Sequence, residues 1–536
     1  MPKKIKSRTN RSQYTVLITA SGTSQELGEI TKYINKTLIK VGRKPTLSYI
    51  IEAYPKNTKY VVTLGHFGEQ VREFIKLVYP DRKVTFVEVK PFEGPGSSLG
   101  YSMLQAKKHL QRPFIYHASD TIVTEKIPPP TRNWIAGVSG EGSSHYTSFD
   151  VQGREVLQFY DKGALSADFL HIGLVGIKDY QAFWKQLQKL YRKNARNAAM
   201  GDVEVLQTLL REGHVFSVQP YTTWHDVGNI DALQKARREI ADSFHILDKL
   251  EESIYFLSGS VVKFFADAKI AQQRVKRANF LKKLVPRIER TGKNFYQYRY
   301  VKGDLYADRA TPADFRGFLQ WAEKNLWRPV HEVSEQEFKT VCRDFYEQKT
   351  HDRIQQFLNT RGLADITTTI NGVRIPSVKK LLREVDFDWL ATTQQTQFHG
   401  DFILDNIIKT KSGFSLLDWR QNFGGLLRAG DKYYDLAKLN HNLVVNHDIV
   451  NANEFAVTIS GSEVECDIRR RERLVECQHE LFSFLAEGGY DAKKVTILTP
   501  LIWLNMAPLH HHPFDLFLFH FGKYKLWQAL RANQTS

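Results

Sequence analysis

Three polar side chains between residues 398 and 418 have the types and spacing that phosphoryl transfer requires. The segment FHGDFILDN places Asp401 five residues before Asn406, and Asp418 follows twelve residues after Asn406 in SLLDWR. A carboxylate can orient or deprotonate an acceptor hydroxyl, while an amide oxygen and a second carboxylate can hold Mg²⁺ against nucleotide phosphates. This set predicts a kinase-type site with Asp401 as the base and Asn406 and Asp418 as metal ligands.

A second group of candidate residues lies in the first half of the chain. The loop SGTSQELG follows the apolar segment 14–20, and Lys36 follows that loop; Asp120 ends FIYHASD and Asp226 stands in WHDVGN. Backbone N–H groups of a glycine-containing loop can approach a triphosphate, and a lysine can neutralise charge that develops on the transferred phosphate. Two carboxylates can share Mg²⁺. The group predicts a nucleotide-dependent transfer site.

The elements that must position these residues differ between the two halves. From residue 14 onward, short apolar runs alternate with helical periods, which predicts an α/β domain with a mainly parallel sheet over residues 12–245. A charged helix without a strand partner is expected after 224–229. Residues 246–325 predict a small α+β lobe, and residues 326–536 predict a mainly helical lobe interrupted by loops.

Three segments define the small lobe. A hairpin is expected in IYFLSGSVVKFFAD, a helix in IAQQRVKRANFLKKL and a strand pair in NFYQYRYVKGDLY.

The second half resembles the aminoglycoside phosphotransferase and choline kinase family, whose pattern is H-x-D-x-x-x-x-N followed by a metal-binding Asp. The resemblance implies a two-lobed, protein-kinase-like α+β fold in which Lys263, in GSVVKFF, holds ATP. Asp431 and Asp435, in AGDKYYDLAKL, match the structural aspartates that follow the metal loop.

The likeness has one departure. The helix after Lys263 shows Ala278 and Asn279 where the family pairs a glutamate with the lysine, so Gln272 or Gln273 is the candidate substitute.

The first half resembles the sugar-phosphate and phosphocholine nucleotidyltransferases, which have a Rossmann-like fold. The resemblance assigns Asp120 and Asp226 to Mg²⁺ and Lys36 and Lys162 to phosphates during transfer. It also assigns nucleotide binding to two loops, through Gly22, Thr23, Gly94, Gly96 and Ser97.

Glu26 departs from the family pattern because it stands where the family has a triphosphate-binding arginine. A carboxylate repels phosphates unless a metal intervenes, so Lys32 or Arg43 is the candidate source of the missing charge.

Composition limits the ligands and the compartment. Lys and Arg number 75 against 58 Asp and Glu, a net charge of +17, which favours anionic ligands. Cys342, Cys466 and Cys477 have neither disulfide nor zinc-ligand spacing, so a reducing cytoplasm is expected. No segment approaches the roughly 20 apolar residues of a membrane span.

Together the two halves predict a bifunctional enzyme. The kinase half would phosphorylate a small alcohol (an amino alcohol, polyol or sugar) with ATP, and the first half would transfer an NMP onto that phosphate. Mg²⁺ is the expected cofactor and CTP the favoured second nucleotide. Such fusions resemble those that make activated donors for surface polysaccharides. No specific nucleic-acid partner is expected, and an oligomer is possible.

Two alternatives stay open. One or both modules could bind nucleotide and regulate a partner without turnover, for example a kinase with a degenerate regulatory N-terminal domain. The net charge of +17 also allows a nucleic-acid-binding protein, which would show steeply salt-dependent binding to oligonucleotides.

Overall fold

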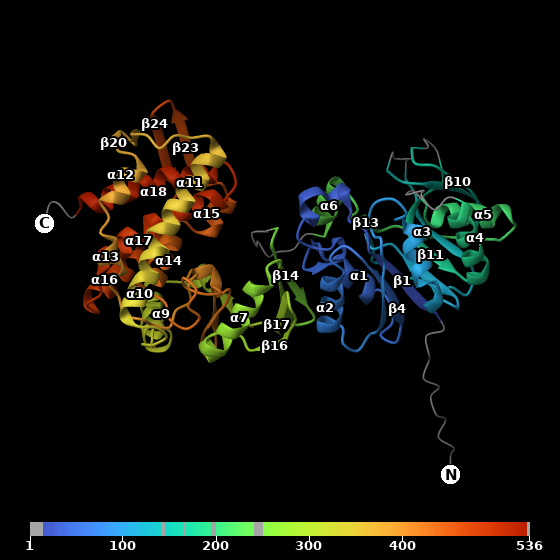
Figure 1. Ribbon diagram of the computed structural model, residues 1–536, viewed down its shortest axis with the longest axis horizontal. Coiled ribbons are helices and arrows are strands. Elements are labelled where there is room, and N and C mark those ends of the chain that lie inside the picture. Colours follow the sequence, from blue (N-terminus) through green and yellow to red (C-terminus); the bar gives the residue numbers. More distant parts are fainter. Residues whose placement is uncertain (1–13, 141–144, 164–166, 194–199, 241–249, 533–536) are drawn as a thin grey trace, which may run out of the picture. The chain divides into compact units, whose positions relative to one another are not determined.

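The computed structural model describes residues 14–140, 145–163, 167–193, 200–240 and 250–532 (Figure 1). The chain divides into two compact units, each of which is described by itself. The first comprises Met1–Ala271 with Glu289–Tyr298, and the second comprises Gln272–Ile288 with Arg299–Ser536. No helix in the described ranges is long and apolar enough to cross a membrane.

A nine-stranded sheet forms the centre of the first unit. The strand order is β5 (Lys83–Glu88), β4 (Lys59–Leu64), β1 (Thr15–Ala20), β6 (Phe114–His117), β11 (Phe169–Ile177), β8 (Trp134–Val138), β12 (Ser217–Tyr221), β10 (Glu155–Tyr160) and β9 (Ser148–Gln152). Its helices are α1 (Thr46–Glu52), α2 (Gly68–Val78), α3 (Leu99–Ala106), α4 (Tyr180–Lys193), α5 (Asp202–Arg211) and α6 (Ile230–Glu239).

The prediction of a mainly parallel sheet is correct for one half of this sheet and wrong for the other. β5, β4, β1 and β6 are parallel. In the other half only β8 and β12 are a parallel pair among the described strands, whereas β11 runs antiparallel to β6, β8 and β9, and β10 runs antiparallel to β9 and β12. The physical reason lies in the connections. β9 and β10 are joined directly by a two-residue turn, and a parallel pair would need a crossover of a dozen or more residues.

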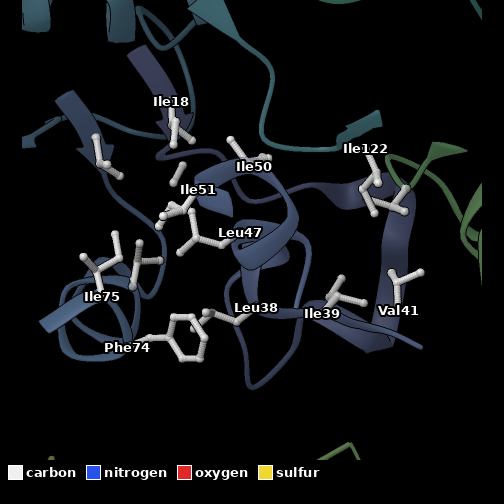
Figure 2. Close-up of a cluster of buried hydrophobic side chains, with 14 of the residues drawn as sticks. Ile18, Leu38, Ile39, Val41, Leu47, Ile50, Ile51, Phe74, Ile75 and Ile122 are labelled. Atoms are coloured by element: carbon white, nitrogen blue, oxygen red, sulfur yellow. The ribbon is translucent and has the colours of Figure 1, made fainter. Parts of the chain in front are cut away.

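Alternate residues of β1 enter two separate cores. Val16, Ile18 and Ala20 lie in the core with α1 and α2, whereas Leu17 lies in the core with α3, α4 and α5. Successive side chains of a strand point to opposite faces, so an unbroken apolar run such as TVLITA is expected where both faces are covered. Figure 2 shows Ile18 in the first of these cores with Leu47, Ile50 and Ile51 of α1.

A second, four-stranded sheet belongs largely to the first unit. Its order is β14 (Glu252–Leu257), β15 (Ser260–Phe265), β17 (Phe295–Arg299) and β16 (Ile288–Thr291). The predicted hairpin is confirmed as β14 and β15, with Ile254 opposite Lys263. Tyr255, Phe264 and Phe295 share a core with Phe74 of α2.

Two neighbouring expectations have different outcomes. The strand pair expected in NFYQYRYVKGDLY is wrong, because β17 and β18 (Asp304–Leu305) lie in different sheets and β18 pairs with β21. The charged helix after 224–229 is confirmed as α6, but its expected continuation to a boundary near residue 245 lies outside the described residues.

The second unit is mainly helical, as expected. After α7 (Ala268–Leu281), a predicted helix whose residues from Gln272 belong to this unit, its helices are α8 (Tyr306–Arg309), α9 (Pro312–Asn325), α10 (Glu335–Tyr346), α11 (Gln348–Arg361), α12 (Val378–Arg383), α13 (Phe387–Ala391), α14 (Lys432–Val444), α15 (His447–Asn451), α16 (Glu472–Glu487), α17 (Ala492–Met506) and α18 (Phe514–Arg531). α14 is buried over most of its length and packs against α16 and α17.

Two small sheets accompany these helices. One has the order β18, β21 (Ile407–Thr410), β22 (Gly413–Leu416), and the other β20 (Val373–Ile375), β19 (Thr368–Ile370), β24 (Glu463–Ile468), β23 (Phe455–Ser460). The hairpin β21–β22 separates the loop of Asp401 from Asp418 and so places both loops at one end of it.

Candidate functional site

In the first unit, a pair of short strands brings Asp120 and Asp226 together. β7 (Thr121–Val123) pairs with β13 (Trp224–Asp226), and Thr121 lies opposite Asp226. The N–H of Val227 also donates to the carbonyl of Asp120, at 3.0 Å. A Cβ placed on Gly228 would lie 3.2 Å from Asp226 Oδ1 and 3.6 Å from Asp120 Oδ2. Both carboxylates therefore border the same glycine, although 106 residues (226 − 120) separate them in sequence.

Lys36 completes this group. Its Nζ lies 2.8 Å from Asp120 Oδ2, and the Lys36 and Asp120 side chains are 18% and 27% exposed. The residue before it, Asn35, fixes the backbone: its side chain donates to the carbonyls of Ala20 (3.0 Å) and His66 (2.6 Å) and accepts from Thr37 N (2.9 Å). The role of Asn35 was not predicted from the sequence, although an asparagine before a short helix is an N-cap signal.

The two carboxylates differ in their electrostatic environment. Burial raises the pKa of Asp120, but the charge and hydrogen bond of Lys36 outweigh burial and hold that pKa below its usual value. Burial, followed by the negative charge of Asp120, raises the pKa of Asp226. Tyr146 donates to Asp226 Oδ2 at 2.7 Å and was not predicted from the sequence. Crowded carboxylates of this kind fit a divalent cation, which would relieve their repulsion.

A metal here would need further ligands. Within the described ranges, no three or more His, Cys, Asp or Glu side chains are grouped as a metal site. Asp120 and Asp226 would supply two ligands, and phosphate oxygens are the natural source of the others.

The structure places the predicted nucleotide loops as follows. Gly22 and Thr23 follow β1, and a Cβ added to Gly22 would meet no atom within 4 Å. Gly94 and Gly96 have φ of 75° and 89°, in the left-handed region that favours glycine, and Ser97 N donates to the carbonyl of Gly94 at 3.1 Å. These loops are open, as backbone contact with a ligand requires.

Other assigned residues lie at the surface. Lys162 is exposed in the turn after β10 and forms no ion pair or hydrogen bond with the described residues. Glu26 is exposed, and Lys32, one candidate for the missing positive charge, is paired with Glu29 at 3.0 Å.

In the second unit, Asn406 and Lys438 hold the side chain of Asp401. Asn406 Nδ2 donates to the Asp401 carbonyl (2.9 Å) and to its Oδ2 (3.1 Å), and Lys438 Nζ lies 2.8 Å from its Oδ1. The Asp401 side chain remains 40% exposed, so a substrate hydroxyl can reach it. Lys438 was missed, although it lies three residues after Asp435 and thus on the same face of α14.

Asp435 and Asp431 hold the surrounding backbone. Asp435 accepts hydrogen bonds from the backbone N–H of His399 (2.7 Å) and Gly400 (2.6 Å), and burial raises its pKa to about 6. Asp431 caps α14 through Tyr433 N (2.9 Å) and accepts from the Tyr346 hydroxyl (2.6 Å). These contacts join the loop before Asp401 to α14, and the N-cap of α14 to Tyr346.

Asp418 follows β22 and adopts φ 56°. Leu417 N donates to the Asn406 carbonyl at 2.7 Å, so the strands of the hairpin tie the two predicted metal ligands to neighbouring positions. Arg274 Nη1 lies 3.6 Å from Asp418 Oδ1.

α7 presents arginines rather than a glutamate to these loops. The guanidinium of Arg277, 1% exposed, donates to four carbonyls, those of Phe398, His399, Arg420 and Leu427, and stacks on the Phe398 ring at 3.8 Å. It thereby joins the loop before Asp401 to the loop after Asp418. Ala278 and Asn279 stand near the place of the missing glutamate. The basic character of the helix favoured a solvated face for Arg277, and this expectation is wrong because Arg277 is buried against the loops.

The remaining predicted residues of the kinase-like group have separate positions. Gln273 accepts from Asn422 Nδ2 at 2.9 Å. Lys263 is buried in β15, in the first unit, whereas Asp401, Asn406 and Asp418 lie together in the second.

Comparisons with known proteins give matches among solved structures. No family model and no curated protein matches the chain. CTP:phosphocholine cytidylyltransferase from Streptococcus pneumoniae is 14% identical, covers 43% of this chain and 100% of its own, and has a TM-score of 0.38. Inositol-1-phosphate CTP transferase from T. maritima is 13% identical, with coverages of 43% and 96% and a TM-score of 0.34.

A third similar structure is UDP-glucose pyrophosphorylase from Acinetobacter baumanii, with 13% identity, coverages of 42% and 92% and a TM-score of 0.36. At these identities and TM-scores the similarity assigns no activity to this chain. Any proposal for the activity of this chain therefore rests on the residues of the chain itself.

Proposed function

We propose that the chain is a bifunctional phosphate-transfer enzyme, and that its first unit transfers a nucleotidyl group onto a phosphorylated small molecule. The observation that carries this proposal is the convergence of Lys36, Asp120 and Asp226 at the β7–β13 pair. A phosphate oxygen of the acceptor attacks the α-phosphorus of the NTP, the bond to the bridging oxygen breaks, and pyrophosphate leaves. CTP is the favoured nucleotide.

The roles of the residues follow from their charges. Asp120, which Lys36 keeps ionised, and Asp226 would hold Mg²⁺, which supplies positive charge against the phosphates. Lys36 then lies where it can exchange its bond to Asp120 for one to the α-phosphate, and so neutralise charge that develops during transfer. Lys162 is assigned to the acceptor's phosphate, and the loops of Gly22, Thr23, Gly94, Gly96 and Ser97 to the nucleotide.

We further propose that the second unit is a small-molecule kinase with a protein-kinase-like fold. Asp401 accepts the proton of the acceptor hydroxyl as the hydroxyl oxygen attacks the γ-phosphorus of ATP, the bond from that phosphorus to the bridging oxygen breaks, and ADP leaves. Two groups on its carboxylate, Asn406 Nδ2 and Lys438 Nζ, fix its orientation. Because the amide nitrogen of Asn406 is used in this way, its oxygen remains for Mg²⁺ together with Asp418.

Acting in sequence, the units would convert a small alcohol into its phosphate and then into a nucleotide-activated donor, with surface polysaccharide as the proposed destination. The cytoplasm, where ATP and CTP are available, is the proposed location. The exposed carboxylate of Glu26 favours a second candidate function, in which the first unit binds nucleotide and regulates the kinase without turnover.

A mass-spectrometric assay separates these functions. The protein is incubated with Mg²⁺, ATP and one NTP at a time, against a panel of amino alcohols, polyols and sugars. A phosphorylated acceptor followed by its NMP adduct supports the bifunctional enzyme. Phosphorylation without an adduct supports the regulatory first unit, and the absence of phosphorylation across the panel contradicts the kinase.

A further inference from the structure

A pocket of about 350 Å³ lies in the second unit beside Asp405, on the same loop as Asp401. Its walls come from this loop, from α14 and α15, from the start of α16 and from Ala307. The polar residues among them are Asp405, Asn442, Asn446, Asp448, Glu472 and two arginines. The residues assigned above to phosphoryl transfer, Asp401, Asn406 and Asp418, do not line it. The pocket is therefore separate from the proposed reaction centre.

Three carboxylates, those of Asp405, Asp448 and Glu472, make the wall of this pocket acidic. Asp405 is fixed by Asn442 Nδ2, 2.8 Å from its Oδ2, and by His447 Nδ1, 3.4 Å from its Oδ1. Asp448 and Glu472 form no ion pair within the described part of the chain. The nearby Asp308 has a pKa raised by burial and then by the charges of Asp448 and Asp405, which marks a negative potential.

The two arginines of the wall are already engaged. Arg471 Nη2 lies 2.9 Å from Glu454 Oε2. Arg473 donates to the carbonyls of Ala307 (2.8 Å) and Ala310 (3.1 Å), so its guanidinium is oriented by backbone. Glu454 offsets the charge of Arg471, whereas Arg473 keeps its charge because the acceptors of these two hydrogen bonds are neutral carbonyls. The three carboxylates of the wall outnumber this one guanidinium, so the pocket favours a cation.

Asn446 adds an independent feature. It lines the pocket, is only 7% exposed, and its Oδ1 caps α15 by accepting from Ile449 N at 3.0 Å. Its Nδ2 is buried and has no hydrogen-bond partner among the described residues. Because a buried N–H without an acceptor is energetically unfavourable, this group calls for an oxygen from a bound molecule.

We propose that the pocket binds a small molecule with an ammonium group and a hydroxyl or carbonyl oxygen. The ammonium lies against Asp405 and Asp448, and the oxygen accepts from Asn446 Nδ2. Binding is independent of the proposed function. Only its consequence for turnover rests on the kinase proposal: Asp405 directly precedes Asn406, so an occupant that holds Asp405 also holds the loop of the proposed base.

Calorimetry on the full-length protein without nucleotide tests the binding. The probes are 2-amino-1,3-propanediol, glycerol and glycerate, which have similar size and differ in charge. We expect the amine to bind about tenfold more tightly than glycerol, a difference of about 1.4 kcal/mol, because its ammonium group is attracted by the carboxylates of the wall. Glycerate should bind most weakly because these carboxylates repel its own. Asp448→Asn should reduce the affinity for the amine about tenfold, and Glu472→Gln should also weaken it.

Asp467→Asn is the matched control, because Asp467 is an exposed acid on β24 and does not line the pocket. Equal binding of amine and glycerol, or equal loss of affinity in the Asp448 and Asp467 variants, would overturn the proposal. Conversion of the bound amine to a phosphoester by ATP and Mg²⁺ would overturn the separation of this site from the reaction. Since Asp448 is exposed, its substitution leaves the fold intact, and a thermal melt verifies this.

Discussion

The two candidate sites are assembled over different sequence distances. Asp120 and Asp226 meet only because β7 and β13 pair across more than a hundred residues, and Lys36 comes from a third segment. Asp401, Asn406 and Asp418 lie within one short stretch, arranged by a hairpin and held by α14 and α7. The first site therefore depends on the whole fold of its unit. The second is largely a local structure that hydrogen bonds from α14 and α7 hold in place.

The two sites also differ in the balance between their carboxylates and their cationic side chains. In the first, two carboxylates share one lysine, and the pKa of Asp226 is raised. In the second, Asp401 is paired with Lys438, and Arg277 donates hydrogen bonds to carbonyls of the surrounding loops. The first site thus has an excess of negative charge that a metal would relieve, and the second is organised before any ligand binds.

The largest effect is expected from Asp401→Asn. If Asp401 acts as the base in the second site and has no role in the first, phosphorylation of the alcohol falls about a thousandfold, which is within the range for a lost general base. Nucleotidyl transfer onto a supplied phosphate is then unchanged. Separate assays of the two steps measure this. Asp467→Asn is the control, and a loss of both activities would contradict the independence of the two sites.

Asp226→Asn should have the next largest effect, on the first site only. Removal of one of two proposed metal ligands should reduce nucleotidyl transfer about a hundredfold and raise the Mg²⁺ concentration needed for half-maximal rate. An unchanged Mg²⁺ dependence would exclude Asp226 as a ligand.

The pH dependence sharpens this test. Because the pKa of Asp226 is raised, its carboxylate is lost at a higher pH than usual as the solution is acidified, and Mg²⁺ should bind more weakly there. In Asp226→Asn this part of the pH dependence should disappear, whereas in Asp467→Asn it should remain.

Arg277→Lys tests whether the hydrogen bonds of Arg277 to the loop carbonyls stabilise the second site. A lysine retains the charge but cannot reach four carbonyls, so we expect the second unit to lose about 2–3 kcal/mol of stability and the kinase step to slow. Urea unfolding followed by tryptophan fluorescence measures the stability. Arg309→Lys, at an exposed arginine, is the control, and equal stability of the two variants would contradict the role of Arg277.

The smallest effect is expected from Glu26→Arg. If Glu26 lies near the phosphates of a bound nucleotide, reversal of its charge should tighten CTP binding several-fold, about 1 kcal/mol. Glu29→Arg, in the same short helix, controls for a general change in charge. Identical effects of the two substitutions would place the nucleotide away from Glu26.

The sequence predicted those parts of the sites that depend on local spacing. The Asp401 motif, the strand ends before Asp120 and the hairpin β14–β15 can be predicted because turns and short-range patterns determine them. The contacts of Lys438 and Arg277 were not predicted because they depend on which loops the two side chains touch. The spacing from Asp435 gives the face of α14 on which Lys438 lies, but not the loop that packs against that face. The antiparallel position of β11 was missed for the same reason, because strand order depends on contacts between distant segments.

Complementation between two variants tests the central claim, that one chain holds two independent transfer sites, most directly. Asp401→Asn and Asp226→Asn are assayed alone and mixed, with ATP, CTP, Mg²⁺ and an alcohol that the native protein phosphorylates, and the nucleotide adduct is measured by mass spectrometry. The account predicts negligible adduct from either variant alone and restored adduct from the mixture. No adduct from the mixture, while Asp226→Asn still accumulates the phosphorylated alcohol and Asp401→Asn is folded, would contradict it.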